Sequence, residues 1–169
     1  MDMYRRTNFR KSGLTLIEIL IVVAILMVLM ITGMVFVQPS LSKGRDGKKK
    51  SDLQQISVAL EEYYNNKASY PAALTTCGET SEIASVLKKV PCEGSGSRAY
   101  LYIADPVGCD AATVRCSGYR LLTDLAYDLD TDIAKKGCTT DFGGKKGCHQ
   151  AGGIVYDYGV AVGRSLADY

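Results

Sequence analysis

The chain has 169 residues, of which 47% are hydrophobic and 22% are charged, and its formal net charge is +2. This length accommodates one modest domain with an accessory segment and would be short for a two-domain enzyme. The small net charge excludes an overall electrostatic footprint for nucleic acid.

The first predicted element is an apolar helix over residues 14–37, which follows a basic leader over residues 1–13. Four residues interrupt its apolar pattern: Thr15, Glu18, Thr32 and Gly33. About 20 apolar residues span a bilayer, whereas the apolar core of a secretory signal has about 7–15. The run therefore predicts a single transmembrane helix.

Glu18 is the only charged residue between Lys11 and Lys43. A carboxylate at the centre of a membrane helix costs about 2.5–3.5 kcal/mol. We therefore expect Glu18 to have a specific partner. The alternative is a protonated Glu18, because buried carboxylates also become neutral by a rise in their pKa.

All six cysteines follow the predicted membrane helix: Cys77, Cys92, Cys109, Cys116, Cys138 and Cys148. An even number in a domain of this size favours disulfides in an oxidising compartment. This places the N-terminus in the cytoplasm and the C-terminal domain outside. Proximity favours sequential pairing among the connectivities that six cysteines allow: Cys77 with Cys92, Cys109 with Cys116, and Cys138 with Cys148.

The stretch SGLTLIEIL over residues 12–20, together with its basic leader, resembles the type III signal of type IV pilins and type II secretion pseudopilins. The resemblance implies that a prepilin peptidase cuts between Gly13 and Leu14 on the cytoplasmic side and methylates the new amine. It further implies an inner-membrane assembly platform with its ATPase, and self-association into a filament. The family usually has Phe at the position of Leu14.

Cleavage would give Glu18 a partner. The new ammonium at Leu14 is four residues away, about 6 Å along a helix axis. In a filament of staggered helices, the amine of an incoming subunit could neutralise Glu18 of its neighbour. Leu14 and Glu18 are therefore the predicted assembly residues.

Residues 38–50 are predicted to form a flexible or kinked connection, since Pro39, Gly44 and Gly47 all disfavour a helix interior. A simple linker before a separate helix is the alternative. An amphipathic helix follows over residues 51–65. Its apolar residues lie at helical spacing: Leu53, Ile56, Leu60 and Tyr63. With the Tyr-Pro pair at 70–71, this region is similar to the major pseudopilin of the G type.

The remaining chain predicts three strands, at residues 98–104, 119–126 and 153–160. We therefore expect an α+β fold, in which a long N-terminal helix packs on a small antiparallel sheet of three to four strands with disulfide-stapled loops. This agrees with the fold that the pilin resemblance implies. The predicted exported globular domain covers residues 51–169.

Asp128, Asp130 and Asp132 have the spacing that opens a calcium loop, but Ile133 stands where the sharp turn needs glycine and Thr139 where a glutamate should close the site. Because major pseudopilins hold calcium in a loop of this region, these three residues are the ligands to test for a calcium site of another kind; solvated carboxylates are the alternative. A zinc site is not expected, because no Cys-x-x-Cys pair occurs and His149 is the only histidine. No cofactor other than calcium is predicted.

The sequence contains no Gly-x-Ser-x-Gly, phosphate-binding loop or His-Glu-x-x-His motif, so no enzymatic activity is predicted. The first hypothesis is a structural filament subunit of a type IV pilus. The alternatives are a pseudopilin of a type II secretion system and a minor tip pilin that binds DNA or a surface. Nucleic acid is expected as a partner only of a tip pilin, because removing the leader, with four basic residues and one acidic, takes the net side-chain charge from +2 to −1. The predicted location is the cytoplasmic membrane before assembly, and an extracellular or periplasmic filament afterwards.

Overall fold

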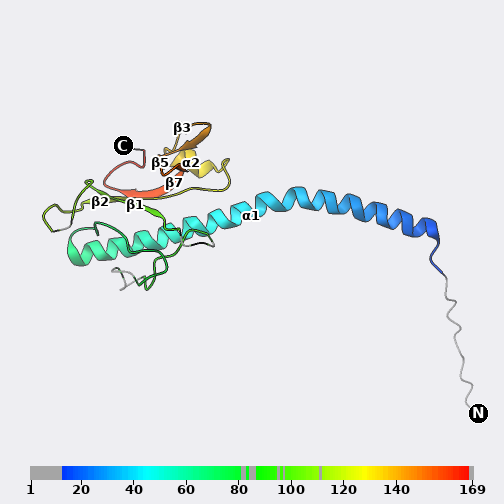
Figure 1. Cartoon of the computed structure of the whole chain (residues 1–169), viewed down its shortest axis with the longest axis horizontal. Coiled ribbons are helices and arrows are strands. Elements are labelled where there is room, and N and C mark those ends of the chain that lie inside the picture. The colour runs from blue at the N-terminus through cyan, green and yellow to red at the C-terminus, as the bar shows by residue number, and fades with distance from the viewer. Residues whose placement is uncertain are drawn as a thin grey trace, which may run out of the picture. The chain divides into compact units, whose positions relative to one another are not determined.

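The computed structural model describes residues 13–80, 83, 87–94, 96, 98–110 and 112–167, without the side chains of 34–39. Residues 1–12 of the predicted leader lie outside this description. Internal contacts divide the chain into one unit through Gln38 and a second from Pro39 to Tyr169. Helix α1, Leu16–Lys67, contributes residues to both units, which are described separately below (Figure 1).

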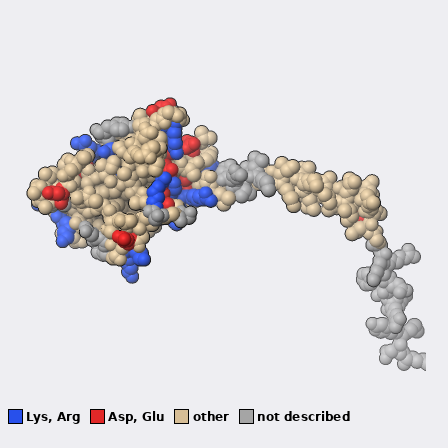
Figure 2. All heavy atoms as spheres, in the orientation of Figure 1, with Lys and Arg blue, Asp and Glu red and all other residues tan. Residues whose placement is uncertain are grey.

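The first unit is the apolar part of α1. Its segment Leu16–Gly33 has a mean hydropathy of 2.8, and none of it is buried within the protein. Among the described residues, it is the one helix segment long and apolar enough to cross a membrane. In Figure 2 it is an almost uniformly uncharged surface with one acidic side chain near its start. Such a surface is stable only in lipid or against other helices.

The second unit is built around a three-stranded antiparallel sheet that packs on the C-terminal part of α1 (Figure 1). The order is β1-β2-β7, with β1 at Leu101–Asp105, β2 at Gly118–Thr123 and β7 at Tyr158–Val162. Leu53 and Ile56 of α1 are fully buried in one core cluster with Tyr119 and Leu121 of β2. The α+β fold with a long helix on a small antiparallel sheet is confirmed.

A second core cluster joins β2 to a region of short elements. Leu122, which alternates with Leu121 along β2, is fully buried there beside Leu125. Both faces of β2 are covered, and all six of its residues are buried, Arg120 and Thr123 included. The short elements are helix α2 at Thr131–Lys135 and two hairpins, made by β3 (Thr140–Phe142) with β4 (Lys145–Gly147) and β5 (His149–Ala151) with β6 (Ile154–Tyr156).

The predicted strand over residues 153–160 is wrong as one element, because the structure divides it into β6 and β7 at Asp157. The buried Asp157 carboxylate accepts a hydrogen bond from the Leu125 N–H at 2.7 Å and lies 3.1 Å from the Lys145 ammonium. Burial raises the pKa of Asp157 despite these two interactions. Tertiary contacts at this aspartate therefore separate two stretches that the residue pattern joins.

Residues 38–50, for which a flexible or kinked connection is predicted, are helical in the structure. Asp46 is buried, and its carboxylate accepts hydrogen bonds from the N–H groups of Ala126 and Tyr127, both at 2.9 Å. The glycine residues disfavour a helix by only about 1 kcal/mol each. The hydrogen bonds that Asp46 accepts from Ala126 and Tyr127 outweigh the low helix propensity of these glycines.

A partly buried ionic cluster contacts the next turn of α1. The Lys49 ammonium lies 3.1 Å from the carboxylate of Glu93, whose side chain is 2% exposed. Arg98 donates to the same carboxylate at 2.5 Å and also pairs with Asp124. Two cations therefore balance two carboxylates, which is the condition for burying charge at tolerable cost.

Candidate processing and assembly site

The predicted cleavage junction, Gly13–Leu14, lies before α1 in backbone without regular structure. Gly13 is exposed, with no heavy atom within 4 Å of the place where a Cβ would stand, and Leu14 is 71% exposed. A peptide bond must be extended and accessible to enter a protease site. The exposure of this junction meets the second requirement.

Thr15 caps the start of α1. Its carbonyl and hydroxyl oxygens accept from the Glu18 N–H at 3.1 and 3.3 Å. Thr15 and Glu18 have the Thr-x-x-Glu spacing of a capping box, and an acidic residue in the first turn also interacts favourably with the helix dipole. The sequence analysis missed this role of Thr15, although the spacing could have revealed it.

Glu18 remains the polar side chain without a partner in this part of the helix. Among residues 14–33, the Thr32 hydroxyl donates to carbonyl oxygens one turn earlier, at 3.0 Å to Leu29 and 3.1 Å to Val28. The exposed Glu18 carboxylate has no hydrogen bond or ion pair with any residue that the structure describes. A carboxylate in this apolar setting requires a partner from outside this chain segment or a proton.

Leu14 lies two residues before the first residue of α1. The sequence analysis places the future amine on the same helix as Glu18, whereas the structure has Leu14 in the preceding irregular segment. The pairing of the Leu14 amine with Glu18 stays a prediction.

The three aspartates predicted as calcium ligands, Asp128, Asp130 and Asp132, lie beside lysines. The Lys50 ammonium of α1 is 2.7 Å from a carboxylate oxygen of Asp130 and 2.7 Å from one of Asp132. Asp128 instead pairs with Lys145 at 3.2 Å. Within the described ranges, no group of three His, Cys, Asp or Glu side chains is placed to hold a metal ion. Calcium binding stays a prediction.

The contacts of Lys50 with Asp130 and Asp132 keep its side chain protonated. Burial alone would lower the pKa of Lys50, but the hydrogen bonds to Asp130 and Asp132 outweigh burial and raise it. The same bond from Lys50 holds the pKa of Asp132 below its usual value. Both groups are therefore charged at neutral pH, and the ammonium occupies the space between two carboxylates that a cation would need. The sequence analysis did not find Lys50, which is 80 residues away from Asp130.

The structure contains three disulfides with the sequential pairing. The Cα–Cα distances are 4.9 Å for Cys77–Cys92, 5.3 Å for Cys109–Cys116 and 4.2 Å for Cys138–Cys148. All three values are near the usual range for disulfides. Each bond closes a local loop in the second unit.

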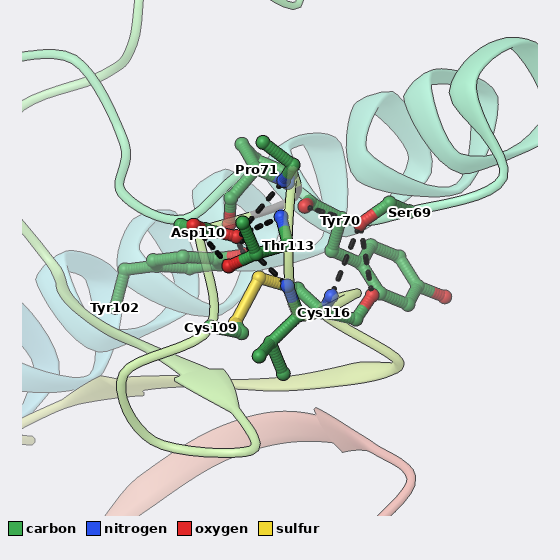
Figure 3. The surroundings of a disulfide bond; sticks show 10 residues. Ser69, Tyr70, Pro71, Tyr102, Cys109, Asp110, Thr113 and Cys116 are labelled. Carbon is green, nitrogen blue, oxygen red and sulfur yellow. Dashed lines mark hydrogen bonds between the residues drawn. A yellow bond between two sulfur atoms is a disulfide. The ribbon is translucent and has the colours of Figure 1, made fainter.

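The Cys109–Cys116 loop holds the chain just after α1 (Figure 3). The Cys116 N–H donates to the Ser69 hydroxyl at 3.1 Å, and the Tyr70 N–H donates to the Cys116 carbonyl at 2.9 Å. Within the loop, the Asp110 carboxylate accepts from the Thr113 hydroxyl at 2.6 Å, and this bond with others lowers its pKa. The loop therefore fixes where the long helix ends.

Comparison with known proteins identifies one matching segment. Residues 8–34 match the family model described as the prokaryotic N-terminal methylation motif. No curated protein and no solved structure matches the chain. The matched segment contains Gly13, Leu14 and Glu18, so the motif and the candidate site coincide.

Proposed function

Residues 8–34 carry the signature of type IV pilins and type II secretion pseudopilins, and on this premise we propose that the chain is the precursor of a structural filament subunit. The prepilin peptidase removes residues 1–13 and methylates the amine of Leu14. The subunit then leaves the membrane through an assembly platform driven by its ATPase. The observation that carries the proposal is the coincidence of this motif with an accessible junction and an unpartnered Glu18.

Glu18 has a chemical role in this proposal. Before cleavage, the nitrogen of Leu14 is an uncharged amide, so the membrane helix contains a carboxylate without a counter-ion. After cleavage, the ammonium of one subunit neutralises Glu18 of the next, and the pair is removed from lipid into the filament core. Processing and assembly are thereby coupled, because only a cut subunit supplies the cation.

The proposed machine is a type IV pilus, and the proposed final location is an extracellular filament. The alternative is the pseudopilus of a type II secretion system, which the likeness of residues 51–71 to the major pseudopilin supports. In both the pilus and the pseudopilus, the second unit is exported to an oxidising compartment. The three disulfides of the structure support this location of the second unit.

Abundance in sheared filaments tests this function. Cells that produce the chain are sheared, and its amount in the filament fraction is compared with that in the membrane. A structural subunit is the main protein of the filament and its deletion abolishes the filament. A filament that keeps its length and amount after deletion would contradict a structural role, and loss of secretion without any surface filament would favour the pseudopilus.

A further inference from the structure

One face of α1 in the second unit is exposed among the residues that the structure describes. Its residues follow each other at alternating intervals of three and four, which keeps them on one side of a helix. We call them the outer stripe: Lys48, Ser51, Gln55, Val58 and Glu62. All five are exposed, whereas Leu53 and Ile56 on the opposite face are fully buried against the sheet.

The two ends of the outer stripe carry opposite charges. Neither Lys48 nor Glu62 has an ion pair or a hydrogen bond within the part of the chain that the structure describes. Their neighbours differ: Lys49 and Lys50 are paired with carboxylates, and Glu61 accepts from the Tyr70 hydroxyl at 3.0 Å. The charges of the outer stripe are therefore available to another molecule.

Near the middle of the outer stripe, one apolar side chain borders a shallow groove. Val58 is 57% exposed, and it lines a shallow groove of about 290 Å³ with Leu87 and the polar residues Ser51, Gln54 and Gln55. A helix face on which one exposed apolar side chain lies among small or neutral polar ones can pack closely against a second helix.

We propose that the outer stripe binds a second copy of this chain, with Lys48 of one subunit paired to Glu62 of the next. The inference rests on the proposed filament function, because subunits that enter a filament from one membrane all have their helices parallel. The two residues are 14 positions apart, so the contact requires an axial stagger of about 21 Å between the paired helices.

The parallel orientation of the two helices lets this contact repeat from one subunit to the next. An antiparallel pair would satisfy both charges of both chains at once and stop at a dimer. A parallel pair uses the basic end of one copy and the acidic end of the other, so each subunit keeps one free end for the next. An interface that joins two different patches continues into a filament unless rotation closes it.

Zero-length cross-linking tests the contact directly. Isolated filaments are treated with a carbodiimide, which joins an amine to a carboxylate only when they touch, and the peptides are sequenced by mass spectrometry. We expect a Lys48–Glu62 link. It must join two copies, since the residues are about 21 Å apart within one helix. Filaments that yield other links but not this one would overturn the inference and leave the proposed function intact.

Charge reversal gives an independent test. We expect Lys48→Glu and Glu62→Lys each to lower the yield of sheared filament at least about fivefold, because like charges then meet across the interface. The double variant should restore the yield. Lys146→Glu, which reverses an exposed lysine on β4, is the matched control and should leave the yield unchanged.

Two outcomes would overturn the inference: full yield in both single variants, or a double variant no better than the worse single one. Absence of any filament from the wild-type chain would instead overturn the proposed function and the inference with it. Folding is checked in every variant by the electrophoretic shift between oxidised and reduced protein, which requires the three disulfides to have formed.

Discussion

Glu18 is subject to opposite demands from insertion and from assembly. A carboxylate costs about 2.5–3.5 kcal/mol at the centre of a membrane helix and less near its end, where Glu18 lies in the first turn of α1, while the proposed filament contact needs the same carboxylate to hold an ammonium. Its backbone N–H also takes part in the Thr15 cap at the start of α1. The side chain and the backbone of this residue therefore have separable roles.

We expect Glu18→Gln and Glu18→Leu to leave the protein inserted and cleaved but to prevent filament growth. Loss of the carboxylate leaves an ammonium unpaired among packed helices, which costs about 3–5 kcal/mol per contact. The measurement is the ratio of sheared filament to cleaved subunit in the membrane.

Thr15→Val is the control for the helix cap. It removes the capping hydroxyl, at a cost of about 1 kcal/mol in helix stability, and keeps the carboxylate. It should assemble much better than either Glu18 variant. If Glu18→Gln and Glu18→Leu assemble as the wild type does, the carboxylate has no amine partner.

A second prediction at this scale concerns His149. Burial lowers the pKa of His149 below its ordinary value of 6.5, and the nearby Arg120 lowers it further. The folded protein therefore binds this proton less well than the unfolded chain. The stability from the neutral imidazole is complete above about pH 6.5 and is lost as the pH falls through the histidine range.

We expect the Tm of the detergent-solubilised full chain to fall between about pH 7 and pH 5.5, above the range where most carboxylates titrate. Since His149 is the only histidine, His149→Gln should remove this slope and keep the acid transition at lower pH. A slope of equal size in the variant would assign the pH dependence to other groups.

At the scale of elements, periodicity predicted the buried face of α1 but neither its continuity through residues 38–50 nor its polar contacts. The spacing of Leu53, Ile56 and Leu60 predicted the buried face, and all three are fully buried. The same pattern carries no information on which distant residue pairs with Lys49 or Lys50. Their partners are more than 40 residues away, and only the folded chain brings them together.

The cleavage junction and Glu18 were found from a local motif, because their chemistry depends on neighbouring residues in the chain. The division between β6 and β7 could not be found in this way. It depends on Asp157 accepting from Leu125, a contact that no residue pattern near 157 encodes. Local rules therefore located the methylation motif, which the family model matches at residues 8–34, but not the topology of the small hairpins.

The contact of α1 with α2 leads to a prediction about calcium. Lys50→Met removes the ammonium between Asp130 and Asp132 and leaves two close carboxylates, which should lower the stability by about 1–3 kcal/mol. Calcium should then raise the Tm of the variant and change that of the wild type little, because Lys50 already supplies the positive charge. A large rise in the wild type would show a calcium site that coexists with Lys50.

The Cys109–Cys116 loop gives a prediction for the end of α1. Replacing both cysteines by alanine should cost about 2–3 kcal/mol, as expected for a short loop. Amides near Ser69 and Tyr70 should then exchange hydrogen faster, because Cys116 bonds both residues. The double variant at Cys138 and Cys148 is the matched control, with faster exchange expected elsewhere. Unchanged exchange at Ser69 and Tyr70 would show that the loop does not hold the helix end.

At the scale of the whole molecule, the two units are suited to different surroundings. The described part of the first unit is apolar and unburied over Leu16–Gly33, and the second has a core and three disulfides. The methylation motif lies at the start of the first unit. A subunit that is held in the membrane before it polymerises outside needs one unit suited to lipid and another suited to water.

The central claim is that this chain becomes a filament subunit only after the cut between Gly13 and Leu14. Intact-mass measurement of the protein from membranes and from sheared filaments, with sequencing of the N-terminal peptide, tests it most directly. We expect one form in the filament, which begins at Leu14 with a methylated amine and has all six cysteines oxidised. A filament form that begins at Met1, or free thiols after rapid alkylation under denaturing conditions, would contradict it.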